Sequence, residues 1–320
     1  MNWKVKAAVQ RACAAMPVGG GAVYYALQRA FGMLDDPDRP LWMIRVAARI
    51  AEDVGRAGPG LHGKRVLEVG TGWRVDLPVG LFLCGAGSID TYDVNRYLRP
   101  GLVMEAVARL AAQRQQIVNT LAGVADGADV ERRLDALARA PDARSVLEIA
   151  GIRYHAPADA TRIDRPAGSV DLHVSFTVLQ LIPYDTLVAL LRESSRLLSA
   201  GGLAWHQVDL SDPFARSDRS ITRANFLRFT DDEWRRWSDN RFGYHNRLRA
   251  ADYERLYREA GHEILDWRAD VDERSRADLA NGFPLSDRFR GLPVEMLATD
   301  TIRVVSRPVR VAHGGSHQEA

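Results

Sequence analysis

The sequence has few of the features that mark secreted, disulfide-bonded or membrane-spanning proteins. Its 320 residues include two cysteines, Cys13 and Cys84, which build neither a disulfide framework nor a zinc site. A membrane span needs about 20 apolar residues in a row, and no such run is present. No long apolar stretch follows the basic residues near the N-terminus, as a signal peptide would require. We therefore expect a cytoplasmic protein without stable membrane insertion.

The sequence also lacks a large excess of positive or negative charge. The chain has 43 lysine and arginine residues against 41 aspartate and glutamate residues, so the net charge is +2. Nucleic-acid-binding proteins usually carry a clustered basic excess, so nucleic acid is not an expected partner. No spacing of His, Cys, Asp and Glu indicates a metal site. The 46% of hydrophobic residues is ordinary for a globular protein with a buried core.

The chain divides into three predicted parts. Residues 1–60 form a helical region, with short helices over 1–33 and an amphipathic helix over 39–56. We expect residues 1–33 to pack as a cap rather than to lie on a membrane surface. Residues 61–306 form the main α/β domain, and residues 307–320 form a disordered polar tail.

The main domain alternates short apolar strands with amphipathic helices. This rhythm predicts a doubly wound, mostly parallel, seven-stranded Rossmann-like sheet. Residues 101–148 lack strand signals and predict a helical insertion of two or three segments. Residues 211–247 predict a long loop with short helices on the side of the sheet where an acceptor substrate would bind. The expected strands span 66–69, 89–92, 152–155, 170–176, 203–208, 263–267 and 301–306.

A glycine loop follows the first of these strands. Gly70 and Gly72 lack side chains, so a ligand can approach the backbone closely where ligands bind in open α/β sheets. Asp93 ends the next strand, and a carboxylate there can accept hydrogen bonds from both hydroxyls of a ribose. This pairing suits any adenosine cofactor. The dinucleotide fingerprint needs a further glycine at position 75, where this chain has valine, which disfavours NAD.

These segments, in this order, resemble the class I methyltransferases. The resemblance covers about residues 66–99 and 152–210 and implies S-adenosylmethionine as the cofactor. It implies that the loop with Glu68, Gly70, Thr71 and Gly72 holds the methionine part and that Asp93 binds the ribose. It further implies that Asp159 and Ala160 contact the adenine. The fourth strand, which contains Ser175, is expected to open onto the cofactor and the substrate. The sequence departs from the family at Arg74, which stands where many members have a third loop glycine.

A narrower resemblance links the chain to methyltransferases found with bacterial polysaccharide or secondary-metabolite genes. It rests on residues 71–73, 77–80, 206–212 and 246–249. A hydroxyl acceptor must lose a proton, and histidine is the usual base at neutral pH. The predicted acceptor-side residues are His206 as the base with Asp209 to orient it, His245 as the second candidate base, and Arg241, Tyr244 and Arg247 as substrate-binding residues.

The sequence therefore predicts methyl transfer to a small-molecule acceptor, by O-methylation of a sugar or another hydroxylated metabolite. Two alternatives stay open at this point. One is an NAD(P)-dependent oxidoreductase on the same kind of sheet, and the other is a non-catalytic Rossmann-like scaffold. Arg74 in the glycine loop is the feature that favours the scaffold.

Overall fold

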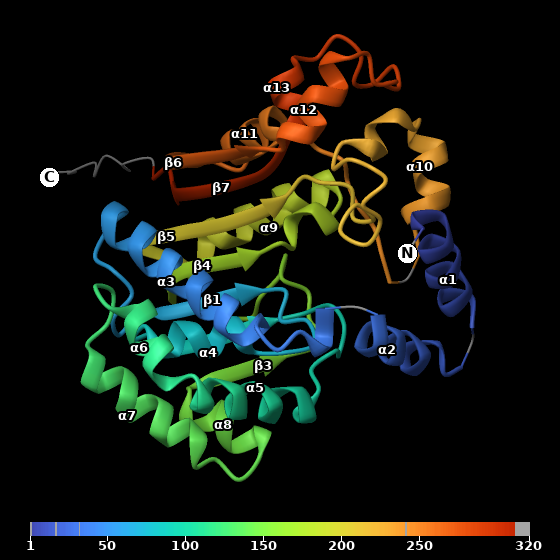
Figure 1. The fold of residues 1–320 in the computed structure, drawn as a ribbon. Coiled ribbons are helices and arrows are strands. Elements are labelled where there is room, and N and C mark those ends of the chain that lie inside the picture. The colour runs from blue at the N-terminus through green and yellow to red at the C-terminus, as the bar shows by residue number, and fades with distance from the viewer. Residues whose placement is uncertain (1, 17, 32, 241, 311–320) are drawn as a thin grey trace, which may run out of the picture.

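A seven-stranded sheet forms the centre of the computed structural model, which describes residues 2–16, 18–31, 33–240 and 242–310 (Figure 1). The strand order is β3-β2-β1-β4-β5-β7-β6. The pairs from β3 to β5 are parallel, whereas β7 runs antiparallel to both β5 and β6. The predicted mostly parallel α/β sheet is confirmed. The strands are β1 (Arg65–Val69), β2 (Ser88–Tyr92), β3 (Ile152–His155), β4 (Val170–Phe176), β5 (Leu198–Asp209), β6 (His262–Val271) and β7 (Thr299–Pro308).

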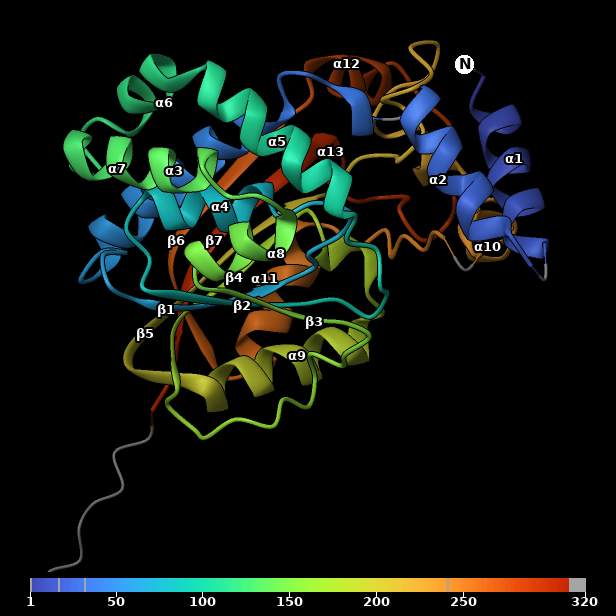
Figure 2. The same cartoon turned by 90° about the horizontal axis from the view of Figure 1, so that it is seen from below.

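Helices cover both faces of the sheet, as a doubly wound fold requires (Figure 2). Successive strand residues point to opposite faces, so Val66 packs toward α3 and α4, whereas Leu67 packs toward α9 and α11. The helices on the first side are α3 (Arg39–Ala57), α4 (Asp76–Leu83), α5 (Pro100–Ala112), α6 (Arg114–Leu121), α7 (Gly127–Ala138) and α8 (Ala143–Ile149). Those on the second side are α9 (Tyr184–Leu197) and α11 (Ala250–Glu259).

Helix α3 has the apolar spacing that the sequence predicts, and it buries its apolar side against the sheet and α4. Its backbone comes very close to α4 at Gly80. A Cβ atom added to Gly80 would lie 2.8 Å from the Cβ atom of Ala47. This close approach fixes the N-terminal ends of α3 and α4 beside each other.

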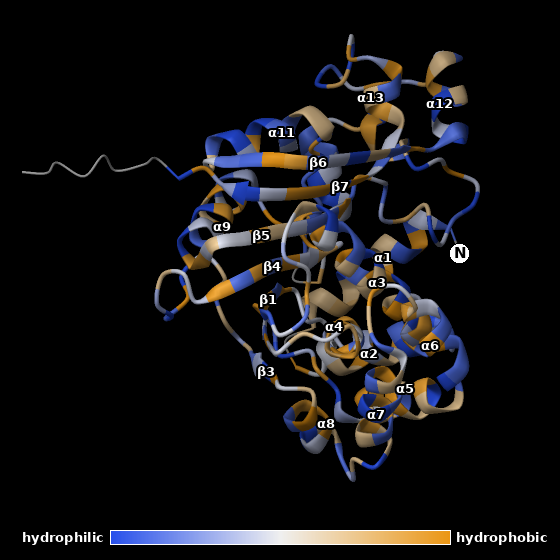
Figure 3. Cartoon of the chain, turned by 90° about the vertical axis from the view of Figure 1, so that its left-hand side faces the viewer, coloured by the Kyte–Doolittle hydropathy of each residue, from blue (hydrophilic) through white to orange (hydrophobic). Residues whose placement is uncertain are grey.

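Figure 3 shows hydrophilic and hydrophobic residues alternating along the outer helices α5 and α7.

The N-terminal helices α1 (Trp3–Ala15) and α2 (Gly20–Phe31) lead into the short η1 (Met33–Asp35). Trp3 anchors α1, because its ring lies 4.9 Å from that of Trp237 in α10 (Asp231–Ser238) and 5.8 Å from that of Phe214. Its backbone N–H donates to the Asp218 carboxylate at 2.8 Å. None of the described helices combines the length and the hydropathy that a membrane-crossing segment requires.

The remaining connections differ from the prediction in detail. The segment between β2 and β3 holds four helices, α5 to α8, rather than two or three. Strand β7 continues to Pro308, so the first residues of the predicted tail pair with β6, and 311–320 lie outside the described residues. The other short elements are η2 (Leu179–Leu181), η3 (Asn225–Arg228), α12 (Glu273–Ala280) and α13 (Val294–Ala298).

Candidate active site

A cavity of about 470 Å³ opens at the carboxyl ends of β1, β2 and β4. This is the edge of an open parallel sheet at which ligands bind. Loop residues after these strands form one part of its wall, and the start of α3 and a loop near residue 242 form the rest. Its described lining includes Leu34, Arg39, Met43, Glu68, Gly70, Thr71, Gly72, Trp73, Arg74, Asp76, Asp93, Tyr97, Ala158, Ala160, Phe176, Thr177, Val178, Asn240 and Tyr244.

The loop after β1 requires glycine at position 70. Gly70 has a φ of +95°, a value that residues with a side chain rarely adopt. A Cβ atom there would lie 2.2 Å from Cγ2 of Val178. The N–H of Gly72 donates to Oδ2 of Asp93 at 2.8 Å, and the N–H of Asn95 donates to Oδ1 at 2.8 Å. The carboxylate after β2 therefore holds the loop after β1 directly.

Two acids in this part of the cavity have raised pKa values. Burial raises the pKa of Glu68 to about 8, even though Thr91 donates a hydrogen bond of 2.5 Å to its Oε2 atom. Desolvation also raises the pKa of Asp93, against the hydrogen bonds from Asn95 and Gly72. Neighbouring acids are hard to ionise together in a poorly solvated site. Near neutral pH, Glu68 is therefore mostly protonated.

The structure brings most of the predicted cofactor residues to this cavity. Its lining contains Glu68, Gly70, Thr71, Gly72, Asp93 and Ala160. Two predicted residues lie elsewhere. Asp159 is exposed and accepts hydrogen bonds from the N–H and hydroxyl of Thr161, while the smaller Ala158 lines the cavity. Ser175 is fully buried within β4 and does not line the cavity, whereas the next two residues of the chain do.

The predicted base His206 lies in the core rather than in the cavity. Its side chain is fully buried, its Nε2 atom lies 2.8 Å from Nδ1 of His173, and its Nδ1 atom lies 2.5 Å from the Tyr257 hydroxyl. Burial, followed by the nearby histidines, lowers its pKa well below the usual value. The assignment of His206 as the base is therefore withdrawn. His173 is a core histidine, as its alternation with apolar neighbours suggests.

The other two predicted catalytic residues are also absent from the described lining. Asp209 accepts hydrogen bonds from Ser211 and from Arg216 Nη2, so it does not orient His206. His245 is 5% exposed, and burial lowers its pKa to about 4. The structure places neither side chain where it could reach an acceptor in the cavity.

The predicted substrate-binding residues do not lie together in the structure. Tyr244 lines the cavity. Arg247 is instead fully buried, where it donates to the carbonyl oxygens of Phe226 and Phe229 and pairs with Asp231. Its predicted role in binding an anionic acceptor is a misassignment, because these partners occupy its guanidinium group. Arg241 lies outside the described residues.

The lining also contains residues that sequence analysis did not assign to the site. Arg39, Arg74 and Asp76 form a charged cluster at the N-terminal ends of α3 and α4. The rings of Trp73 and Tyr97 stack with their centroids 4.6 Å apart, and Tyr25 from α2 lies 5.2 Å from Trp73. The loop departure at Arg74 was the available signal. The link from Arg74 to Arg39 of α3 runs through Asp76 and depends on tertiary packing.

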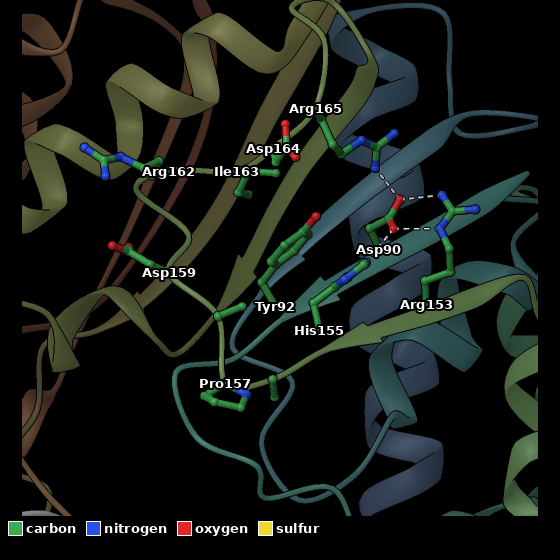
Figure 4. Close-up of a pocket in the computed structure, with 12 residues that line it drawn as sticks. Asp90, Tyr92, Arg153, His155, Pro157, Asp159, Arg162, Ile163, Asp164 and Arg165 are labelled. Carbon is green, nitrogen blue, oxygen red and sulfur yellow. Dashed lines mark hydrogen bonds and ion pairs between the residues drawn. The ribbon is translucent and has the colours of Figure 1, made fainter.

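A second hollow, of about 700 Å³, lies beside β2 and β3 (Figure 4). The charges around Asp90 satisfy one another. Arg153 donates to both oxygens of Asp90 at 2.7 and 2.6 Å, and His155 and Arg165 bind the same carboxylate. Although desolvation opposes it, the hydrogen bonds from Arg153 and His155 lower the pKa of Asp90 to about 2. Within the described residues, no group of His, Cys, Asp and Glu is placed to hold a metal ion.

No family model matches the chain, and no curated protein matches it. Several solved structures are similar to it. A SAM-dependent methyltransferase from Methanosarcina mazei is 12% identical, with 81% of this chain and 98% of that chain covered at a TM-score of 0.42. A SAM-dependent methyltransferase from Leishmania major is 14% identical. The match covers 96% of this chain and 83% of that chain at a TM-score of 0.43. The [4+2]-cyclase SpnF is 14% identical. The match covers 82% of this chain and 81% of that chain at a TM-score of 0.41.

Proposed function

We propose that the protein is an S-adenosylmethionine-dependent methyltransferase that acts on a small molecule. The observation that carries this proposal is the hydrogen bond from Gly72 to Asp93 at the mouth of the cavity. It joins a glycine loop, which a ligand can approach closely, to a carboxylate that can bind ribose hydroxyls. Both lie at the carboxyl edge of the parallel strands.

The residues present fit the cofactor in three respects. Gly72 borders open space, because nothing lies within 4 Å of a Cβ atom added there, so a ligand can approach its backbone closely. Each oxygen of Asp93 accepts one backbone hydrogen bond and keeps a further lone pair for a hydroxyl. Ala158 and Ala160 offer small apolar surfaces suited to an adenine ring.

When bound, S-adenosylmethionine supplies a methyl group on a positively charged sulfur atom. The role of this chain is to hold the acceptor in line with that methyl group at near-attack distance. The stacked rings of Trp73 and Tyr97 and the ring of Phe176 give the cavity an aromatic wall that excludes water. No acid is needed for the leaving group, because the sulfur becomes neutral.

We further propose a hydroxyl of a sugar or of another hydroxylated metabolite as the acceptor. Tyr244 and Asn240 provide polar contacts in the cavity, and Trp73 provides a ring on which a sugar can pack. No histidine appears among the described lining residues, so the acceptor proton needs another base. Glu68 is the lining acid whose pKa of about 8 suits that task.

The first test is isothermal titration of the purified protein with S-adenosylmethionine, S-adenosylhomocysteine and NADH. We expect micromolar binding of the first two and none of NADH. The position that a dinucleotide fingerprint fills with glycine is Val75, which caps α4 and is buried. Binding of NADH alone would move the protein to the oxidoreductases, and a folded protein that binds none of the three would be a scaffold. A positive result would then justify a screen of hydroxylated acceptors for methyl transfer.

A further inference from the structure

The charged cluster in the cavity wall consists of Arg74, Asp76 and Arg39. Arg74 is 4% exposed, and Asp76 is 3% exposed. Nε of Arg74 lies 2.8 Å from Oδ2 of Asp76, and Nε of Arg39 lies 3.7 Å from the same oxygen. Two positive charges thus face one negative charge.

The ion pairs of this cluster leave several of its polar atoms without hydrogen bonds. Nη1 of Arg74 donates to the Leu34 carbonyl oxygen at 3.0 Å. Its Nη2 atom, Oδ1 of Asp76 and Nε of Arg39 have no hydrogen-bond partner among the described residues, whereas Nε of Arg74 and Oδ2 of Asp76 are joined in their ion pair. Buried polar atoms without partners are rare in proteins, and here they gather in the wall of one cavity. A bound group that supplied both donors and acceptors would satisfy them.

The free atoms specify the chemistry of that group. Nη2 of Arg74 and Nε of Arg39 are unpartnered donors on two guanidinium groups, and such donors bind the oxygens of a carboxylate. The unpartnered Oδ1 atom of Asp76 calls for a donor, and an ammonium group offers three. A phosphate would be repelled by Asp76, and a simple cation would be repelled by the two arginines. A group that carries both charges suits the cluster.

The positions of the helices support the same assignment. Arg39 is the first residue of α3, and Asp76 is the first residue of α4. The positive ends of two helix dipoles therefore meet at this corner of the cavity and favour a carboxylate there. The close contact of the helices at Gly80 holds the two ends in place.

We propose that Arg74, Arg39 and Asp76 form a subsite for an α-amino-acid group, which is the methionyl end of the cofactor. The carboxylate binds Arg74 and Arg39, and the ammonium group binds Asp76. This inference rests on the proposed function, because S-adenosylmethionine is what brings that group to the cavity. Arg74, at the position of the third loop glycine, then positions the cofactor through its side chain.

The test is isothermal titration with three ligands. S-adenosylhomocysteine has the whole amino-acid group, 5′-S-(3-aminopropyl)-5′-thioadenosine lacks the carboxylate, and 5′-methylthioadenosine lacks both charges. Arg74→Gln should weaken S-adenosylhomocysteine about tenfold or more and leave the other two ligands unchanged. Asp76→Asn should weaken both ligands that carry an ammonium group and leave 5′-methylthioadenosine unchanged.

The matched control is Arg109→Gln. Arg109 donates to the Asp36 carbonyl oxygen at 2.9 Å near this cluster but does not line the cavity, so the control should bind all three ligands like the wild type. If Arg74→Gln does not fold, Arg39→Gln replaces it, because Arg39 is 29% exposed, and it should show the same selectivity with a smaller loss.

Two results would overturn the subsite. One is unchanged affinity of Arg74→Gln or its replacement for S-adenosylhomocysteine. The other is an equal loss for 5′-methylthioadenosine, which would show a purely structural role. Failure of the proposed function looks different, because the wild-type protein would then bind none of the three ligands.

Discussion

The backbone N–H of Gly72 donates a hydrogen bond of 2.8 Å to Oδ2 of Asp93. The two residues follow different strands, β1 and β2, which pair in parallel with Val69 opposite Tyr92. Parallel pairing brings their carboxyl ends to one edge, where the carboxylate fixes the loop before any ligand arrives. Such preorganisation lowers the entropic cost of binding.

Asp93→Ala should weaken the binding of S-adenosylhomocysteine by about 1–3 kcal/mol, because the ribose hydroxyls lose their partner. The matched control is Asp159→Ala, which removes an exposed carboxylate that bonds to Thr161 outside the cavity. Titration calorimetry should show a loss for the first variant and none for the second. Wild-type affinity in Asp93→Ala would remove the ribose assignment.

Gly70→Ala should lower the free energy of unfolding by more than the cost of backbone strain alone. Gly123 provides the comparison, because its φ of +94° matches the +95° of Gly70 while nothing lies within 4 Å of its added Cβ atom. Both variants should lose about 1–3 kcal/mol from backbone strain, and Gly70→Ala should lose more through its collision with Val178. Denaturant unfolding of the two variants measures the difference. Equal losses would mean that the loop moves easily away from Val178.

Local patterns predicted the parts of the site that are close in sequence. The apolar run into Gly70, the helix after it and the strand that ends before Asp93 form one βαβ unit, and the handedness and pairing of such units are nearly fixed. Ala160 was placed through the family resemblance, although the side chain of Asp159 points elsewhere.

The sequence could not predict what surrounds β5. His206 pairs with Ser175 of β4 on one side and with Val304 of β7 on the other, so it lies inside the sheet. The last strand of the chain takes this place between β5 and β6, and no local signal near residue 206 indicates it. Arg74 likewise acquires its role from Arg39, which is brought to it by the packing of α3 on α4.

His206→Ala should act on stability rather than on chemistry. The change leaves a cavity and removes a partner from both His173 and Tyr257, so we expect a loss of about 2–4 kcal/mol in the free energy of unfolding. The exposed His62 provides the control substitution. Affinity for S-adenosylhomocysteine, measured on folded protein at low temperature, should stay at the wild-type value. A stable variant with greatly reduced turnover would instead restore a catalytic role to His206.

Glu68 should make the stability of the protein depend on pH in the neutral range. Burial raises its pKa from 4.5 to about 8 in the folded protein. Between these values the folded state holds a proton that the unfolded state has lost. The unfolding free energy therefore falls as the pH rises, by up to about 1.4 kcal/mol per pH unit for this group, and levels off above the folded pKa. Glu68→Gln cannot ionise, so it removes this slope.

The measurement is denaturant unfolding of both proteins from pH 6.5 to pH 9. The core histidines titrate alike in the two proteins, so their contribution cancels in the difference. The wild-type protein should lose stability relative to Glu68→Gln as the pH rises to about 8. The exposed Glu131 gives the matched control, and Glu131→Gln should follow the wild-type curve. Parallel curves for wild type and Glu68→Gln would mean that Glu68 is already ionised in the folded protein. The pKa of Glu68 would then lie below this pH range, and its carboxylate would be too weak a base for the proposed role.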